Sequence, residues 1–227
     1  MPVTIKVRRA CFPLVLASGN RNKHVEFSWF FKNIEAFAVC GVEILPPDEA
    51  LMKNGGPEVE ESGGSYEENA LIKARAWADF TGLPTIADDS GLEVRALGWA
   101  PGIRSARSAA GDDADRVSWL LGELGDASDR RACFAACLVI ALPGAHLCAG
   151  RNFFSSEGRC WGSISSSQRG DGGFGYDPIF VPEGGCLTFA ELGGLKSEIS
   201  HRAIAMRGVA QIIASVVKYN AICGLQR

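Results

Sequence analysis

The chain has 227 residues, of which 47% are hydrophobic and 22% charged, so it can bury one sizeable core but is short for two independent domains. Its 23 basic and 26 acidic residues give a formal net charge of −3, which leaves no overall positive field to hold a polyanion such as DNA. The eight cysteines form no CxxC pair or zinc-like cluster, and we expect reduced core thiols rather than a disulfide framework.

The N-terminal segment carries Lys6, Arg8 and Arg9 but no apolar stretch long enough for a signal peptide. We interpret residues 1–12 as a flexible extension and residues 13–227 as a single domain. No window of the chain approaches the roughly 20 apolar residues needed to span a bilayer. We therefore expect a cytoplasmic protein that binds neither membrane nor nucleic acid.

The first half of the chain alternates short apolar runs with helical periodicity. Residues 14–17 predict a buried strand that enters a turn at residues 18–20. From Lys23 onward a helix is expected, because Phe27, Phe30, Phe31 and Ile34 share one 3.6-residue face. Residues 42–45 predict a second strand and residues 46–65 a loop. A second helix is expected to begin near Tyr66, with its core face formed by Ala70, Leu71, Ala74 and Trp77.

The second half begins with a brief predicted strand at residues 85–87, which ends in Asp88, Asp89, Ser90 and Gly91, before extended structure resumes at residues 92–94. A loop at 98–111 and a helix around 114–124 follow. Strands are predicted at 132–141 and 146–154, separated by a Pro143-Gly144 turn, and a final helix at 200–217. Strands that alternate with helices and then pair locally predict an α/β fold with a mixed sheet.

The turn after the first strand is a candidate phosphate site. Free backbone N–H groups and the helix dipole favour an anion where a strand hands over to a helix. Gly19 allows the backbone to approach a phosphate, Ser18 and Asn20 can donate side-chain hydrogen bonds, and Lys23 adds a positive charge. On its own the turn is equally consistent with an ordinary capped helix start.

A candidate metal site lies where acidic residues gather. Asp88 and Asp89 follow a predicted buried strand, where two adjacent carboxylates repel each other unless a cation offsets them. The preceding loop and helix start add further hard oxygen ligands for Mg²⁺, namely Glu58, Glu60, Glu61, Glu67 and Glu68. For Glu67 and Glu68 a solvated helix N-terminus is the favoured interpretation.

A glycine-rich segment and a basic segment form a third candidate site. Residues 170–178 contain Phe174 and Tyr176 among their glycines, and such rings can stack on a purine. Asp177 can accept a hydrogen bond from a ring N–H. Ser200 is a candidate N-cap of the last helix, and His201 and Arg202 can donate to a base carbonyl. Each feature alone also has an ordinary structural interpretation, as a turn, a helix start or a surface charge.

Taken together, these sites resemble the inosine triphosphate pyrophosphatase family, also called XTP/dITP diphosphatases. The resemblance runs from Leu14 to about Met206 and is carried by five motifs in the family's order: LASGNRNK, EESGGSYEENALIKARAWADFTGLPTIADDSGLEV, APGIRSAR, GGFGYDPIF and LKSEISHRAIAM. It implies an elongated mixed β-sheet flanked by helices, two lobes with a substrate cleft between them, and a homodimer.

The resemblance also implies residue roles. Asp89 would be the catalytic proton acceptor, and Mg²⁺ would bind Asp89 and the pair Glu60 and Glu61, without a choice between the two glutamates. The implied substrate contacts are Ser18, Gly19, Asn20, Arg21, Asn22 and Lys23 for the triphosphate, then Ser90, then Phe174, Gly175, Tyr176, Asp177 and Lys196 for the nucleoside, and His201 and Arg202 for the base. The implied reaction converts ITP, dITP or XTP into the monophosphate and pyrophosphate.

We further hypothesise that His201, Arg202 and Asp177 select a 6-keto purine, because adenine presents an amino donor there and would leave a buried donor unpaired. Guanine shares the 6-keto group, so GTP would have to be excluded through its 2-amino group. A rival reading is a pyrophosphatase for modified pyrimidine nucleotides, which the GGFGYDP and SHR motifs disfavour. Another is a nucleotide-sensing or RNA-binding module without hydrolysis, which would not need Asp89.

Overall fold

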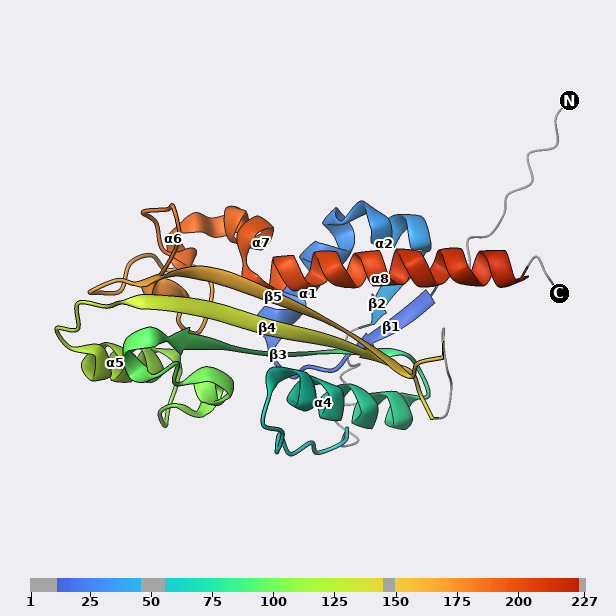
Figure 1. Ribbon diagram of the computed structural model, residues 1–227, viewed down its shortest axis with the longest axis horizontal. Helices are drawn as coiled ribbons and strands as arrows, with labels where there is room; N and C mark the ends of the chain where they lie inside the picture. The colour runs from blue at the N-terminus through green and yellow to red at the C-terminus, as the bar shows by residue number, and fades with distance from the viewer. Residues whose placement is uncertain (1–11, 46–55, 145–149, 225–227) are drawn as a thin grey trace, which may run out of the picture.

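The computed structural model describes residues 12–45, 56–144 and 150–224. Its centre is one mixed six-stranded sheet with the strand order β2-β1-β3-β4-β5-β6. The strands are β1 (Phe12–Leu16), β2 (Val42–Leu45), β3 (Thr85–Val94), β4 (Arg131–Ala141), β5 (Phe153–Ile164) and β6 (Phe180–Pro182). β1 is parallel to β2 and β3, and the other pairs are antiparallel. The predicted α/β fold with an elongated mixed sheet is confirmed (Figure 1).

Helices cover both faces of this sheet. The helices are α1 (Arg21–Asn33), α2 (Glu35–Cys40), α4 (Tyr66–Thr81), α5 (Asp113–Leu124), α6 (Phe189–Leu192), α7 (Lys196–Ile199) and α8 (His201–Gly224). Figure 1 shows α4 and α5 on one side of the long strands and α8, with α1 and α2, on the other. No helix within the described ranges is long and apolar enough to cross a membrane.

Local sequence signals set the helix starts. Asn20 and Ser65 cap α1 and α4 through their side chains, and Asp112 forms a capping box with Asp115 at α5. The predicted core face of α1 is confirmed for Phe27, Phe30 and Phe31, whereas Ile34 is only partly buried. Ser200 accepts a hydrogen bond from Ala203 N, as expected of an N-cap at the start of α8.

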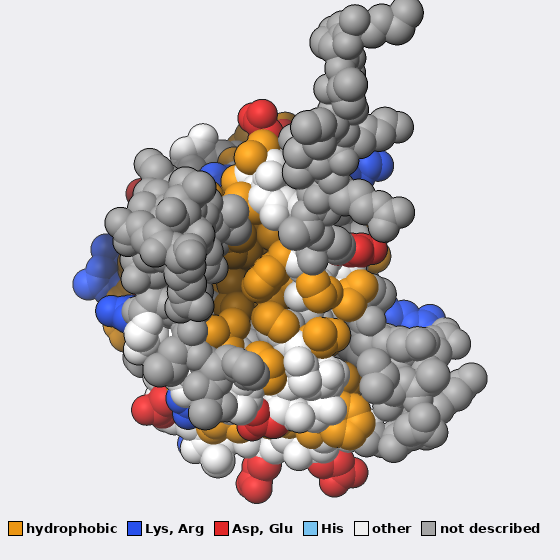
Figure 2. All heavy atoms as spheres, turned by 90° about the vertical axis from the view of Figure 1, so that its right-hand side faces the viewer, with side chains coloured by type: hydrophobic (Ala, Val, Ile, Leu, Met, Phe, Trp, Pro, Cys, Tyr) orange, Lys and Arg blue, Asp and Glu red, His pale blue; other side chains and the backbone are white. Residues whose placement is uncertain are grey.

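The buried apolar side chains form clusters on both faces and at both ends of the sheet. One cluster joins β1, α1, α2 and α8, and another joins β1, α4 and β4. A third, around Phe134 and Phe180, joins β3, β4, β6, α5 and α6. Figure 2 looks onto the end that carries β1, β2 and the last turns of α8, where hydrophobic side chains make up much of the visible face between the grey segments.

Two predicted features differ in the structure, and one helix was not predicted. β3 runs without a break from Thr85 to Val94, so Asp88 and Asp89 lie inside a strand and not at its end. The strand expected at residues 146–154 is wrong, since β5 begins at Phe153. Residues 145–149 lie outside the described residues, as do residues 1–11 of the expected extension. The short helix α2 was not anticipated, because its six residues are too few to show periodicity.

One edge of β3 is left open by the shortness of β1. β1 pairs with β3 only at Thr85 and Ile86 within the described residues, whereas β4 pairs with all ten residues of β3 on the other edge. The backbone of β3 at residues 87–90 is therefore available to groups that approach this edge, whereas residues 92–94 are paired with or hydrogen-bonded to residues 100–105.

α8 packs directly against β5, because a glycine faces it. A Cβ atom at Gly158 would meet His201 O and Ala205 N closer than 3.0 Å, a separation that real Cβ atoms essentially never show. Ser156, two residues earlier on β5, donates a hydrogen bond from Oγ to Ala205 O at 2.8 Å. This contact fixes the start of α8, and with it the residues that open the helix.

We expect Gly158→Ala to push α8 away from β5 and to lower the free energy of unfolding by about 1–3 kcal/mol, the usual effect of overpacking. Urea denaturation measures this change. Gly122→Ala is the matched control, because Gly122 lies in α5 with nothing within 4 Å of the added Cβ. Alanine there should stabilise the helix by roughly 0.5–1 kcal/mol. Equal effects of the two variants would contradict the close packing of α8.

Candidate active site

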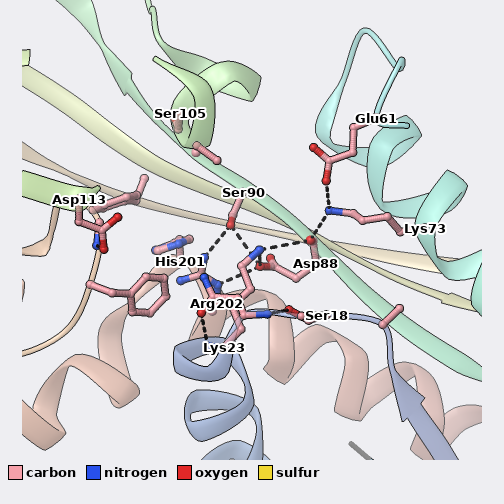
Figure 3. A pocket seen from close by; sticks show the side chains of 18 of the residues that line it. Ser18, Lys23, Glu61, Lys73, Asp88, Ser90, Ser105, Asp113, His201 and Arg202 are labelled. Atoms are coloured by element: carbon pink, nitrogen blue, oxygen red, sulfur yellow. Dashed lines mark hydrogen bonds and ion pairs between the residues drawn. The ribbon is translucent and has the colours of Figure 1, made fainter. Parts of the chain in front are cut away.

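A cavity of about 610 Å³ lies at the open edge of β3. Its walls come from the turn between β1 and α1, α4 and the segment before it, β3, the start of α5, the glycine-rich segment and the start of α8. Figure 3 shows Glu61 and Lys73 at one side of the cavity and Asp113 at the opposite side, with Asp88 and Ser90 between them. Segments from both halves of the chain therefore share one cavity.

Asp88 and Asp89 point to opposite faces of the sheet, because successive side chains on a strand alternate. The Asp88 carboxylate contacts Lys23 of α1 and Arg202 of α8, whereas the Asp89 carboxylate contacts Asn69 and Lys73 of α4. Each carboxylate thus has cationic partners of its own, two for Asp88 and one for Asp89. The mutual repulsion that the sequence suggested is relieved by this separation and not by one shared ion.

The Asp88 carboxylate is buried between two cations. Its Oδ2 lies 2.7 Å from Lys23 Nζ and 3.1 Å from Arg202 Nε, and it accepts a hydrogen bond from Ser90 Oγ at 3.1 Å. Burial alone would raise the pKa of Asp88, but the charges of Lys23 and Arg202 outweigh it and hold the pKa well below its usual range. Asp88 therefore stays ionised and anchors both cations.

Arg202 and Lys196 continue this network toward the glycine-rich segment. Arg202 donates from Nη2 to Ser90 Oγ at 2.6 Å and from Nη1 to Glu26 Oε2 at 3.2 Å. Lys196 Nζ lies 2.6 Å from both Glu26 Oε1 and Asp177 Oδ2. The buried ion pairs thus form a network that runs from Lys23 at the start of α1 to the glycine-rich segment.

On the other face, Lys73 Nζ lies between two carboxylates. It is 2.8 Å from Glu61 Oε1 and 3.2 Å from Asp89 Oδ1, and Arg107 Nη1 contacts Glu61 Oε2 at 3.0 Å. Burial raises the pKa of Asp89 despite the charge of Lys73. The pKa of Glu61 is lowered, because its hydrogen bond to Lys73 and the nearby charges outweigh the effect of burial. Two hard oxygen donors therefore converge on one cationic group.

The open edge of β3 brings the two faces together. The backbone oxygen of Asp88, which faces this edge, accepts a hydrogen bond from Lys73 Nζ at 2.8 Å and lies 3.5 Å from Lys23 Nζ. Two ammonium groups from helices on opposite faces therefore meet at one carbonyl. This end of the cavity is suited to a polyanion.

The glycine-rich segment forms the other end of the cavity. Asp177 Oδ2 accepts a hydrogen bond from Phe174 N at 2.8 Å, and Asp113 Oδ2 accepts one from Gly175 N at 2.7 Å. Gly173 has φ +75° and leaves no room for a Cβ beside Asp177, so the turn requires glycine there. Lys196 Nζ and Arg202 Cζ lie 4.7 and 5.1 Å from the centroid of the Phe174 ring. The aromatic ring is thus held beside the buried cations.

His201 closes this end of the cavity. Its ring is 1% exposed and stacks on Phe134 with 4.6 Å between centroids and 8° between planes. Burial, and then the charges of Arg202 and Lys196, lower the pKa of His201 well below its usual value. The imidazole is therefore neutral.

Most of the predicted contact residues line this cavity: Ser18, Gly19, Asn20, Lys23, Ser90, Phe174, Gly175, Tyr176, Asp177, His201 and Arg202. Arg21 and Asn22 are exposed and do not line it. Asn20 Oδ1 accepts hydrogen bonds from the N–H groups of Asn22 and Lys23, so the helix cap uses two donors that the sequence assigned to phosphates. Asp89 and Lys196 lie just behind the wall, in contact with Lys73 and Asp177.

The predicted metal ligands are only partly together. Glu61 and Asp89 both contact Lys73, whereas Glu60 is exposed and does not line the cavity. Across the described ranges, no group of three His, Cys, Asp or Glu side chains is arranged to hold a metal ion. Of the two glutamates, the geometry favours Glu61.

Sequence reasoning missed several polar residues of the site, among them Lys73, Asn69 and Glu26. Asn69 and Lys73 are four residues apart on α4, and Glu26 follows Lys23 by three on α1, so each pair shares a helix face. That spacing could have indicated a polar face on each helix, but both helices were interpreted by their apolar faces alone.

The chain is similar to known proteins in both sequence and structure. Residues 14–212 match the model of the Ham1 family. A dITP/XTP pyrophosphatase of Synechococcus sp. (strain CC9311) is 46% identical over 79% of the chain and 78% of the relative. A dITP/XTP pyrophosphatase of Mycobacteroides abscessus is 40% identical over 90% of the chain and 96% of the relative. The structure of the Staphylococcus aureus Ham1 protein superposes with a TM-score of 0.74 at 33% identity, over 89% of the chain and 98% of that protein.

We expect Asp88→Asn to lower the free energy of unfolding by about 3–5 kcal/mol, because it leaves two buried cations without their shared carboxylate. Urea denaturation at neutral pH measures the loss. Asp129→Asn is the control, since Asp129 pairs with Arg131 at the surface and its loss should change stability little. A small effect at Asp88 would show that the network does not hold these elements together.

Proposed function

The chain belongs to the Ham1 family, and from this membership and the chemistry of the cavity we propose that it hydrolyses non-standard purine nucleoside triphosphates. The substrates are ITP, dITP and XTP, and the products are the nucleoside monophosphate and pyrophosphate. The reaction clears these nucleotides from the pool. The observation that carries the proposal is a single cavity with converging ammonium groups at one end and a buried aromatic and imidazole surface at the other.

The polyanionic part of the substrate belongs at the cationic end. Lys23 and Lys73 reach the same backbone oxygen of Asp88, and Ser18 and Gly19 line the adjacent wall. Positive groups fixed before the substrate arrives stabilise the charge that builds on phosphate oxygens during phosphoryl transfer. This arrangement supports a triphosphate whose innermost phosphorus lies near the edge of β3.

The residues present fit Mg²⁺. Glu61 and Asp89 already converge on one cationic group, Lys73 Nζ, and carboxylate oxygens are the donors that Mg²⁺ prefers. Glu61 and Asp89 would therefore hold the ion, which when bound supplies charge neutralisation at the phosphates. Lys73 lies close enough to the same two carboxylates to offset their negative charge.

Asp89 is the proton acceptor in this proposal. Without a bound cation, burial raises the pKa of Asp89, so the carboxylate has a higher affinity for a proton than an exposed aspartate. Asn69 Nδ2 lies 3.2 Å from Asp89 Oδ2 and orients the group. A water beside Asp89 that loses its proton attacks the innermost phosphorus, the bond to the bridging oxygen breaks, and pyrophosphate leaves.

The base end supports selection of a 6-keto purine. A neutral His201 can either donate or accept a hydrogen bond, so it contacts the base without rejecting an amino group by itself. Arg202 lines the cavity and is a donor only, so it favours a carbonyl over an amino group. Asp177 is committed through Oδ2 to Lys196 and Phe174 N, and so acts mainly by holding them. An unpaired buried donor costs roughly 1–3 kcal/mol, which predicts about 10- to 100-fold preference for ITP over ATP.

The test measures pyrophosphate release from ITP, XTP, GTP and ATP, with and without Mg²⁺. We expect Mg²⁺-dependent release from ITP and XTP well above that from ATP. Asp89→Asn should lower the rate by about 10²- to 10⁴-fold, the usual contribution of a general base. Asp126→Asn, the same chemical change at an exposed turn, should leave the rate unchanged. Equal rates on ATP and ITP, or an active Asp89→Asn, would refute the proposal.

We also propose a homodimer that acts in the cytoplasm, as the family resemblance implies. Light scattering of the purified chain should give twice the mass of 24.2 kDa. A mass equal to that of one chain would refute the dimer without affecting the proposed reaction.

A further inference from the structure

His201 differs from most buried histidines in how its ring is held. Neither Nδ1 nor Nε2 has a hydrogen-bond partner among the described residues, although the ring is 1% exposed and lines the cavity. A buried polar atom without a hydrogen-bond partner lowers the stability of the folded state. Such a ring is therefore suited to form a hydrogen bond with a bound ligand. A hydrogen bond to one ring nitrogen ordinarily fixes which nitrogen carries the proton. Here the protein supplies no such bond.

The contact that orients the ring is Phe134 on β4. Its ring lies parallel to the imidazole, with 4.6 Å between centroids and 8° between planes. Phe134 is itself fixed, because its ring is parallel to Phe189 at 5.7 Å and edge-on to Phe180 at 4.7 Å. β4 is also paired on both edges, where Phe134 lies opposite Leu92 and Cys160. The imidazole therefore rests on a rigid aromatic face.

We propose that Phe134 is a positioning residue for the base: it holds the plane of His201 by stacking alone and leaves both ring nitrogens to the substituent at position 6 of a purine. This inference rests on the proposed function, in which His201 contacts the base. Stacking restrains the plane of a ring but does not select which ring nitrogen carries the proton. The bound base, and not the protein, then decides which nitrogen carries the hydrogen.

The kinetic test compares two substrates in two variants. Phe134→Leu removes the stacking face, and Phe37→Leu, the control, removes an equally buried ring from a different cluster, where it stacks on Phe31. The substrates are ITP and the triphosphate of purine riboside, whose base carries only hydrogen at position 6. Phe134→Leu should lower kcat/KM for ITP about tenfold, mainly through KM, because one hydrogen bond is misaligned. The purine riboside substrate should change less than about twofold. Phe37→Leu should leave the ratio of the two substrates unchanged.

Nitrogen NMR supplies a readout that loss of stability would not move. The chain has only three histidines, so the ring signals of ¹⁵N-labelled His201 can be assigned. In the wild type we expect a mixture of neutral tautomers without ligand and one tautomer with inosine monophosphate. Phe134→Leu should retain the mixture with the ligand, whereas Phe134→Tyr, which keeps a stacking ring, should behave as the wild type.

Two results would overturn the inference. One is a parallel fall for both substrates in Phe134→Leu. The other, which needs only the wild type, is a ligand-free His201 fixed in one tautomer, since a protein hydrogen bond would then orient it. A wild type that releases no pyrophosphate from ITP would instead refute the proposed function, and the NMR result with inosine monophosphate would still decide the role of Phe134.

Discussion

The arrangement of the site depends on the buried contact of the Asp88 carboxylate with Lys23 and Arg202. These three residues lie on α1, β3 and α8, which come from the beginning, the middle and the end of the chain. A charge buried without a partner is far too costly to tolerate, so the folded state must bring all three elements together. Through Glu26 and Lys196 the network continues to Asp177, so the two ends of the cavity are fixed relative to each other.

Much of the fold follows from local patterns in the sequence. Periodicity, turn residues or motifs account for the aromatic face of α1, the strand at residues 42–45, the helix start near Tyr66 and the cavity segments at residues 18–23 and 174–177. The partners that lie far away in the sequence do not follow from such patterns. Lys73 is an ordinary helix residue until β3 lies against it, and so is Glu26 until Arg202 of α8 does. A pairing across 16 or 176 residues leaves no mark on local spacing. The position of β5 was missed for the same reason, since its pairing with β4 and not its own composition fixes where it begins.

The proposed chemistry divides between the two ends of the cavity. Converging cations and the carboxylates of Glu61 and Asp89 gather at the end where charge must be neutralised. Rings and a neutral imidazole gather at the end where a flat base is to be recognised. At the cationic end, ion pairs fix the positions of the side chains. At the aromatic end, stacking and the turn around Gly173 and Asp177 fix them. The two kinds of contact suit the two parts of a nucleotide.

The alternation of Asp88 and Asp89 along β3 makes the alignment of this strand with β4 a functional property. Asp88 lies opposite Leu138 and Asp89 opposite Cys137. A slip of one residue would turn every side chain of β3 to the other layer. A slip in one direction would place Asp89 beside Lys23 and Arg202, and a slip in the other would place Asp88 beside Lys73. In either case one of the two positions would lose its carboxylate, because Ser90 or Ala87 would occupy it. The long antiparallel pairing of β3 with β4 therefore determines which surroundings each of the two adjacent aspartates has.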